Sequence, residues 1–198
     1  CILSILSQTY PVKVHLIVDD SSEDRTVEIA KKYEEKGVVV VSSGLPKGER
    51  AYGLRIGLVQ QKGIEYVTKL VPDWRYLLIV DADTVLPDNY CEKIIYQMLK
   101  DKWLAMAGSS ILHTPVGIEK TSEIHVRGCN HVIRRRFYEI CRKMRKTYAN
   151  KHNEILLERT AFSIGWKIKT FPIEGVKELR PTTIKKMGEF EKGLRDYK

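Results

Sequence analysis

Asp81 and Asp83 are the residues whose type and spacing most directly suggest chemistry. They follow the apolar run Leu77–Val80 and are separated by one residue. Such a run, rich in β-branched residues, is typical of a strand buried on both faces, and alternation along an extended chain puts both carboxylates on one side. A hard cation such as Mg²⁺ takes one or two carboxylates together with phosphate oxygens. The pattern therefore favours a cation and phosphate site, and an ordinary polar turn is the simpler alternative.

A second acidic pair, Asp19 and Asp20, ends the apolar run Leu16–Val18. Ligands bind at the carboxyl ends of strands in open α/β sheets, so adjacent parallel strands would bring the two pairs into one anionic pocket. There a carboxylate accepts hydrogen bonds from ribose hydroxyls or a base N–H, and a cation neutralises a diphosphate. The chain has neither Gly-x-Gly-x-x-Gly nor a Walker loop, which disfavours dinucleotide-binding and ATP-hydrolysing proteins.

Apolar periodicity predicts strands that alternate with helices along the chain. We expect strands at 12–18, 38–41, 77–80, 103–111 and 166–171, and helices at 1–9, 26–36, 50–70, 87–100, 130–147, 154–163 and 182–197. This alternation predicts an α/β fold in which helices flank a mostly parallel sheet. We place one domain at 1–175 and a polar helical extension at 176–198.

Composition describes an ordinary globular chain, with 43% hydrophobic and 30% charged residues among 198. No apolar run approaches the roughly 20 residues of a membrane span. The four cysteines form no Cys-x-x-Cys pair, which disfavours a zinc site and favours a reducing, cytoplasmic location. The first residues lack both an initiator Met and the basic start of a signal peptide, so we expect a piece of a longer protein.

Nearly all of the net charge of +9 comes from residues 127–151, where nine Lys and Arg face only Glu139. The simplest interpretation is a core-packed helix with a solvated basic face. The alternative is an interfacial helix at 130–147 that meets anionic headgroups, or a lipid-phosphate acceptor, at the inner face of a membrane. Nucleic acid is not an expected partner, because few stacking aromatics accompany the charges.

Three segments together resemble the family 2 glycosyltransferases of GT-A fold, in order and in spacing: Ser4–Pro11, Leu16–Thr26 and Val80–Thr84. The resemblance implies a Rossmann-like nucleotide-diphospho-sugar transferase that uses a UDP- or GDP-linked donor. It implies that Asp20, with Asp19 beside it, contacts the base and ribose. It also implies that Asp81 lies near the ribose and sugar, and that Asp83, with Asp81, holds Mg²⁺ or Mn²⁺.

The segment 48–57 resembles the family's Gly-x-x-x-Ala-x-Asn-x-Gly, with Arg55 where Asn is usual, and Arg50 is a candidate for the donor side. Members of the family invert the anomeric centre, and their base comes from a Glu-Asp pair that opens a helix. Alignment on Arg159 puts His152 and Asn153 at that pair.

Glu154 is the nearest carboxylate and our candidate base, and His152 is a second candidate because of its pKa near neutrality. The simpler explanation of Glu154 is a first-turn residue favoured by the helix dipole.

In the family a further strand precedes the position of Cys1, so we expect this chain to lack its first strand. The Gln-x-x-Arg-Trp motif of processive members is also absent, which disfavours a polysaccharide synthase. The main hypothesis is a metal-dependent inverting transferase with a lipid, glycan or protein acceptor. The alternatives are a catalytically impaired nucleotide-sugar-binding protein of the same fold, and a basic membrane- or nucleic-acid-binding module.

Overall fold

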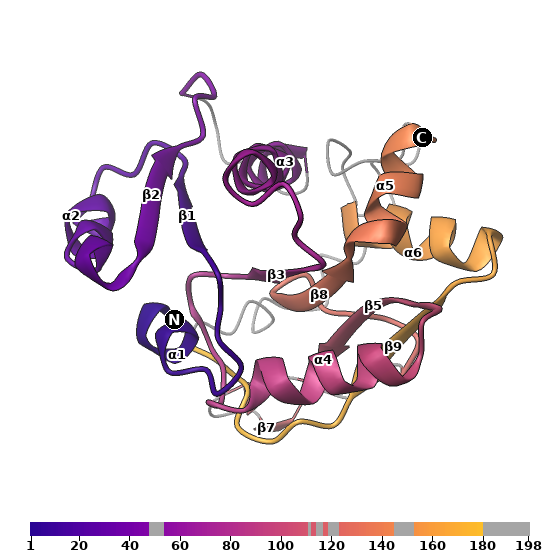
Figure 1. Cartoon of the computed structure of the whole chain (residues 1–198). Coiled ribbons are helices and arrows are strands. Elements are labelled where there is room, and N and C mark those ends of the chain that lie inside the picture. The colour runs from indigo at the N-terminus through magenta and orange to yellow at the C-terminus, as the bar shows by residue number, and fades with distance from the viewer. Residues whose placement is uncertain (48–53, 111, 114–116, 119–122, 145–152, 180–198) are drawn as a thin grey trace, which may run out of the picture.

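The computed structural model describes residues 1–47, 54–110, 112–113, 117–118, 123–144 and 153–179, except for the side chains of the two short strands at 112–118 and of Asn153 and Glu154. Its strands form three sheets (Figure 1). The first pairs β1 (His15–Asp19) with β2 (Val38–Ser42) in parallel. The second has the order β3 (Tyr76–Val80), β8 (Asn130–Arg134), β5 (Leu104–Ser109) and β9 (Lys167–Phe171). The third has the order β4 (Thr84–Val85), β10 (Lys177–Glu178), β6 (Leu112–His113) and β7 (Gly117–Ile118).

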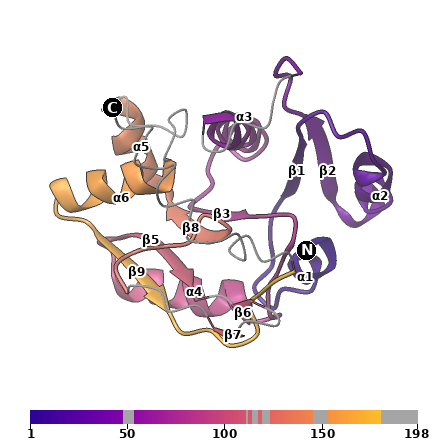
Figure 2. The same cartoon turned by 180° about the vertical axis from the view of Figure 1, so that it is seen from behind.

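Helices surround these sheets, which confirms the α/β class. They are α1 (Ile2–Leu6), α2 (Thr26–Lys31), the 3₁₀ turn η1 (Glu34–Lys36), α3 (Leu54–Leu70), α4 (Tyr90–Lys100), α5 (Arg135–Lys143) and α6 (Asn153–Ser163). Figure 1 shows α2 outside the β1–β2 pair and α4 against β5, and Figure 2 shows α6 beside β9 from behind.

Local sequence explains most of these elements. In β9, alternate residues are exposed and buried, as the alternation of Lys167, Lys169 and their apolar neighbours predicts. Gly165 ends the turn before it with a φ of 75°, a conformation that glycine adopts at little cost. The inner face of α4 is Tyr90, Cys91, Ile94, Ile95 and Met98. Leu99, which we expected there, is 65% exposed because it lies outside this stripe.

The second sheet is mixed rather than mostly parallel. β8 runs antiparallel to both β3 and β5, and β9 runs parallel to β5. All five residues of β3 are partly exposed, so the expectation of a strand buried on both faces is wrong. The reason is position: within the described residues, β3 pairs only with β8 and has no strand on its other side.

The basic segment is the largest correction to the secondary structure. We expected one helix over 130–147, but Asn130–Arg134 is strand β8 and only Arg135–Lys143 is helix α5. β8 lies between β3 and β5, and the backbone hydrogen bonds from both sides favour the extended form for its β-branched residues. Residues 145–147 lie outside the described part. A continuous interfacial helix is therefore excluded.

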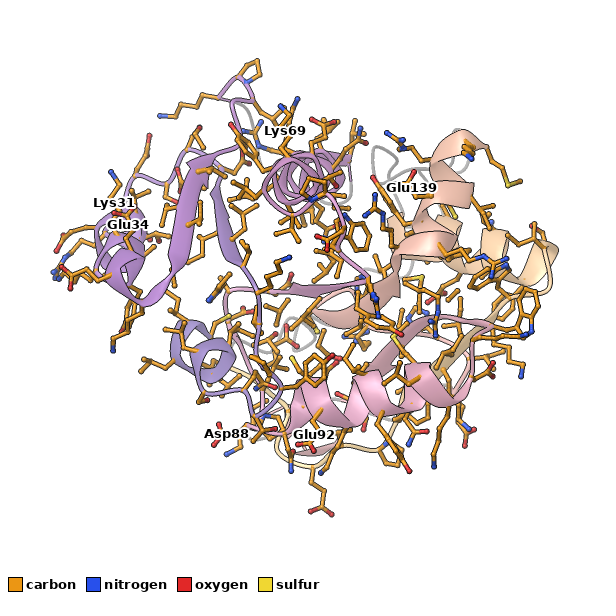
Figure 3. All side chains as sticks on the ribbon, viewed as in Figure 1. Lys31, Glu34, Lys69, Asp88, Glu92 and Glu139 are labelled. Carbon is orange, nitrogen blue, oxygen red and sulfur yellow. The ribbon has the colours of Figure 1, made fainter. Side chains whose placement is uncertain are left out.

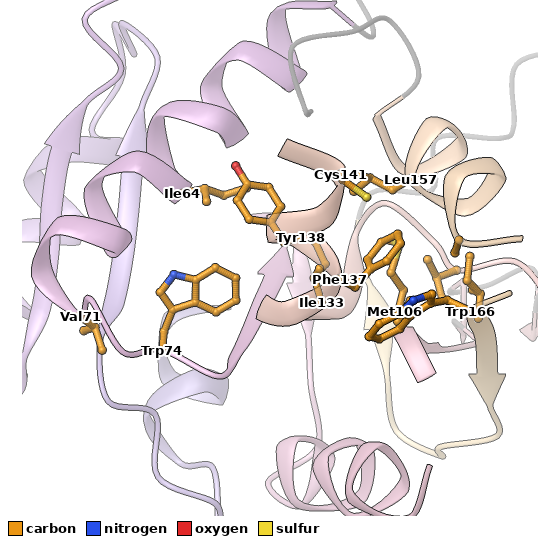
Figure 4. Packing of buried hydrophobic residues seen from close by; sticks show 14 residues of the cluster. Ile64, Val71, Trp74, Met106, Ile133, Phe137, Tyr138, Cys141, Leu157 and Trp166 are labelled. Carbon is orange, nitrogen blue, oxygen red and sulfur yellow. The ribbon is translucent and has the colours of Figure 1, made fainter. Parts of the chain in front are cut away.

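The hydrophobic core has two clusters, one on each face of the second sheet. Figure 4 shows the first, in which Phe137 and Tyr138 of α5 lie between Trp74 and Trp166. The second cluster centres on α4 and includes Ile5 of α1. Two acidic side chains near the start of α4, labelled in Figure 3, complete the contact with α1: Asp88 accepts a hydrogen bond from Ser7, and Glu92 accepts one from Thr9.

Candidate functional site

Asp81 and Asp83 lie in a turn that begins where β3 ends. The Thr84 N–H donates to the Asp81 carbonyl over 3.0 Å, which closes a turn. We expected the two aspartates to continue the extended strand, and this expectation is wrong. The turn is held from two sides. The Asp81 N–H donates to the Cys129 carbonyl over 3.0 Å, and the Leu179 N–H donates to the Asp83 carbonyl over 2.9 Å. The turn is thus held by the residue before β8 and by the residue after β10.

The oxygen donors of this turn suit Mg²⁺ or Mn²⁺. Asp81 is exposed and Asp83 is half-buried, and the described residues contain no cluster of three His, Cys, Asp or Glu side chains that would hold a metal alone. Two carboxylates completed by substrate phosphates are a common arrangement for such hard cations. Burial, together with the charges of Asp81 and Glu178, raises the pKa of the nearby Cys129 thiol to about 12. The turn therefore offers a cation two carboxylate groups, those of Asp81 and Asp83.

Glu178 belongs to this neighbourhood and was missed by the sequence analysis. It is buried in β10, where it pairs with Thr84 directly after the turn. No local sequence pattern predicts that Glu178 lies beside this turn, because the contact depends on a strand pairing between distant parts of the chain. This pairing also packs residues 177–179 against the domain that we expected to end at residue 175. Residues 180–198 lie outside the described part, so the polar helical extension stays a prediction.

Asp20 follows β1 and accepts hydrogen bonds on both carboxylate oxygens. Arg55, in the first turn of α3, donates to it through Nε over 2.5 Å and through Nη2 over 2.8 Å, and Ser43 donates over 2.8 Å. Partial burial by itself raises the pKa of Asp20. The hydrogen bonds from Arg55 and Ser43, with the charge of Arg55, outweigh burial and bring the pKa below its ordinary value. Asp20 is therefore a fixed carboxylate.

Arg55 takes a role that the resemblance did not assign to it. Its Nη1 also donates to the Pro46 carbonyl over 3.0 Å, so one guanidinium joins the end of β1, the loop after β2 and the start of α3. The Asp19 side chain is less constrained: among the described residues, its carboxylate accepts the Ser22 N–H, over 3.3 Å. Arg50 lies outside the described residues. Asp19 and Asp20 come from a different sheet than Asp81 and Asp83, so a shared pocket stays a prediction.

Replacing Arg55 by Met is expected to lower the free energy of unfolding at pH 7 by about 1–2 kcal/mol, because the ion pair is neither fully exposed nor fully buried. The side chains of Arg55 and Asp20 are 17% and 26% exposed. Since the pKa of Asp20 is lowered, the pair stabilises fully above the ordinary value of 3.8 and loses its effect as pH falls through the lowered pKa.

Urea unfolding at several pH values measures this difference between wild type and variant. Arg25→Met removes an exposed pair with Glu28 and is the matched control, with a nearly unchanged urea midpoint expected. A pH-independent difference for Arg55→Met would contradict the ionic account.

The expected acceptor side is only partly described. Glu154 lies in the first turn of α6, as predicted, but its side chain is outside the described part. His152 lies outside it altogether. Neither candidate base is therefore tested by the geometry.

Several cations of the basic segment are used inside the fold. Arg134 donates to the carbonyls of Leu104 and Asp101, both over 2.9 Å, and Arg135 donates to the Pro72 carbonyl. These contacts support the simple interpretation of a packed basic segment for Arg134 and Arg135. In the described part, no helix combines the length and apolar character that crossing a bilayer requires.

Several solved protein structures have a similar fold. A mannosyltransferase from Pyrobaculum calidifontis, solved with GDP-Man and Mn²⁺, shares 16% identity at a TM-score of 0.62, over 92% of this chain and 53% of that one. TarS of S. aureus, solved with UDP, shares 14% identity at a TM-score of 0.62, over 89% of this chain and 54% of that one. A nucleoside-diphosphate-sugar pyrophosphorylase from Vibrio cholerae shares 13% at a TM-score of 0.54, over 86% and 77%.

The chain thus spans about half the length of the two glycosyltransferase-like structures, which show its fold as GT-A. No curated protein sequence matches it. The model of one sequence family, described as glycosyl transferase family 2, matches residues 1–162, which include both acidic pairs and the start of α6. The chain therefore belongs to glycosyl transferase family 2.

Proposed function

We propose that this protein is a metal-dependent inverting glycosyltransferase that moves a sugar from a nucleotide diphosphate to a hydroxyl or phosphate acceptor. The observation that carries the proposal is the Asp81–Thr84 turn, which two separate segments hold at the carboxyl end of β3 in a family 2 chain. That position is where α/β sheets bind ligands, and its two carboxylates suit a cation bound to a diphosphate.

On the donor side, Asp83 and Asp81 are the proposed ligands of Mg²⁺ or Mn²⁺. When bound, the cation neutralises the charge that develops on the leaving diphosphate. Asp20 and Asp19 are proposed to contact the base and ribose. Among the described residues, Arg55 and Ser43 take three acceptor positions of the Asp20 carboxylate, so Oδ2 has room for one N–H or O–H of the nucleotide. Arg50 is proposed to line the same side.

On the acceptor side, a base takes the proton of the attacking hydroxyl while the anomeric configuration inverts. Glu154 and His152 are the proposed candidates. Asn153, which stands where a carboxylate is usual, favours a second function: a nucleotide-sugar-binding protein of the same fold without turnover. A full-length protein that binds donor but never releases nucleotide diphosphate would identify this alternative.

The acceptor is proposed to be a lipid phosphate, a glycan or a protein. A lipid-phosphate acceptor would place the reaction at the cytoplasmic face of a membrane. Exposed cations on α5, among them Arg136 and Lys143, remain available for anionic headgroups after Arg134 and Arg135 are used internally. A module that binds only membranes or nucleic acid is the third hypothesis. It predicts salt-dependent binding to vesicles or DNA and no affinity for nucleotides.

Calorimetric titration of UDP and GDP into the full-length protein, with and without Mn²⁺, tests the proposal. We expect one nucleotide to bind in a metal-dependent way, and Asp83→Asn to weaken that binding at least about tenfold, or 1.4 kcal/mol. Asp73→Asn changes an exposed aspartate that pairs with Lys13 and is the matched control, expected to bind like wild type. A folded protein that binds neither nucleotide in the presence of Mn²⁺ would refute the transferase.

A further inference from the structure

A histidine and a buried glutamate form a pair that no part of the proposed function uses. Glu158 of α6 is only 7% exposed, and its carboxylate contacts Nδ1 of His125 at 2.9–3.0 Å. The same carboxylate accepts the Val126 N–H over 2.9 Å. The Thr170 hydroxyl donates to the His125 carbonyl, which fixes the backbone below the ring. A carboxylate on Nδ1 places the proton there and leaves Nε2 with a free lone pair.

The His125 ring is accessible as well as oriented. Its side chain is 37% exposed, although its partner carboxylate is almost fully covered. Among the residues that the structure describes, none forms a hydrogen bond with Nε2. A half-exposed imidazole held by a buried carboxylate is the arrangement that proteins use to orient a histidine base.

The pair stands at the same sheet edge as the aspartate turn. β3, β5 and β9 run in one direction, so their carboxyl ends share an edge with the start of β8. The segment 123–129 crosses this edge: the Thr170 N–H at the end of β9 donates to the Glu123 carbonyl, and the Asp81 N–H after β3 donates to the Cys129 carbonyl. His125 therefore lies toward β9 and the aspartates lie beyond β3.

The spacing fits a donor that extends along the edge. Three strand intervals separate β9 from β3, which is about 14 Å at about 4.8 Å each. This distance accommodates three groups in line: a cation-bound diphosphate, an anomeric carbon and an attacking hydroxyl. Glu154 lies one turn before Glu158 in α6, and positions four apart share a helix face. This places the pair beside the helix that the resemblance assigns to the acceptor side.

We propose that His125, oriented by Glu158, is the general base for the acceptor hydroxyl in place of Glu154 or His152. The proposal rests on the proposed function and names a residue for its acceptor site. The Nε2 lone pair takes the hydroxyl proton while the hydroxyl oxygen bonds to the anomeric carbon. The bond from that carbon to the diphosphate oxygen breaks, and the diphosphate leaves with the electron pair. The negative Glu158 carboxylate stabilises the imidazolium that forms.

Chemical modification tests this placement without requiring turnover. Diethyl pyrocarbonate acylates unprotonated imidazole nitrogens, and mass spectrometry locates the modified histidine. After calorimetry identifies the nucleotide that binds with Mn²⁺, we expect the corresponding nucleotide-sugar to slow modification of His125 at least about fivefold. The nucleotide diphosphate alone is expected to leave the rate unchanged, because it lacks the sugar that approaches the ring.

Kinetics of the full-length protein provide the second arm. The readout is the nucleotide diphosphate released when the sugar is transferred to water or to an added octyl glycoside. His125→Gln is expected to lower kcat about 100-fold, within the range for loss of a general base, with nucleotide affinity within about twofold of wild type. His15→Gln, at the start of β1, is the matched control and is expected to keep full activity.

The outcomes separate the two proposals. If no nucleotide binds, the proposed function fails and this inference fails with it. If nucleotide-sugar binds but His125 is equally reactive with and without it, only the base assignment is overturned. Normal kcat in His125→Gln, together with lost turnover in Glu154→Gln, likewise overturns it. If a preparation shows no turnover, the protection of His125 from diethyl pyrocarbonate decides whether the base assignment holds.

Discussion

Asn130→Ala is expected to lower the free energy of unfolding by about 3 kcal/mol, because it removes a buried acceptor and leaves the Ser109 N–H without its partner. Asn130 is fully buried at the start of β8. Its Oδ1 accepts the Ser109 N–H over 3.0 Å and the Tyr90 hydroxyl over 3.2 Å. The Ser109 N–H loses its partner in the variant, and a void replaces the amide.

The same substitution is expected to disturb the aspartate turn, since Asn130 directly follows Cys129, whose carbonyl holds Asp81. Gly108 of β5 packs against this spot so closely that a Cβ there would lie 2.8 Å from the Asn130 carbonyl oxygen. The backbone therefore has no room to shift and rescue the lost contacts.

Thermal and urea unfolding measure the effect, with a fall in Tm of about 6–12 °C expected for a chain of this size. Asn89→Ala is the matched control: Asn89 precedes α4 without a capping hydrogen bond from its side chain, so its replacement is expected to cost less than about 0.5 kcal/mol. Equal Tm values for the two variants would show that the network around Asn130 is not a main source of stability.

Arg134→Met is expected to have the largest effect on stability, about 3–4 kcal/mol, because one guanidinium serves several buried carbonyls. Its Nη2 donates to the carbonyls of Met98 and Asp101 at the end of α4, and its Nε donates to Leu104 at the start of β5. Its Nη1 reaches the Tyr76 hydroxyl over 3.2 Å, so β3 is tied to the same group. Methionine fills a similar volume but donates no hydrogen bond.

Urea unfolding also tests this prediction. Arg134→Lys keeps the charge but not the planar fork of donors, and an intermediate loss of about 2 kcal/mol is expected. Arg136→Met is the matched control from the same segment. Arg136 is exposed and its guanidinium lies 6.0 Å from the centroid of the Trp166 ring, so a loss below about 1 kcal/mol is expected. Similar losses for Arg134→Met and Arg136→Met would mean that the carbonyl contacts contribute little.

These two variants also bear on the basic segment. Arg134 donates hydrogen bonds to the carbonyls at the end of α4, so its guanidinium is not available to lipid headgroups. If Arg136→Met weakens binding to anionic vesicles without a loss of stability, the exposed part of α5 is the membrane contact. If vesicle binding is absent in wild type, the simple interpretation of a packed basic segment holds.

The sequence by itself determined the elements whose signal is local. The acidic residues at the carboxyl ends of β1 and β3, the alternation of β9 and the helix that ends before Gly165 all lie where the sequence predicted them. Side-chain periodicity and turn residues are properties of a few neighbouring positions, so they can be read without knowing the fold. The family resemblance came from the same local segments.

Only the tertiary structure decided the features that depend on distant pairing. Residues 130–134 form a strand because β3 and β5 flank them, although their continuation into α5 suggested a helix. Glu178 reaches the aspartate turn, Arg55 fixes Asp20, and Glu158 orients His125 through contacts between segments far apart in the sequence. Hydrogen-bond partners and burial are set by which strands meet, and no local period encodes that choice.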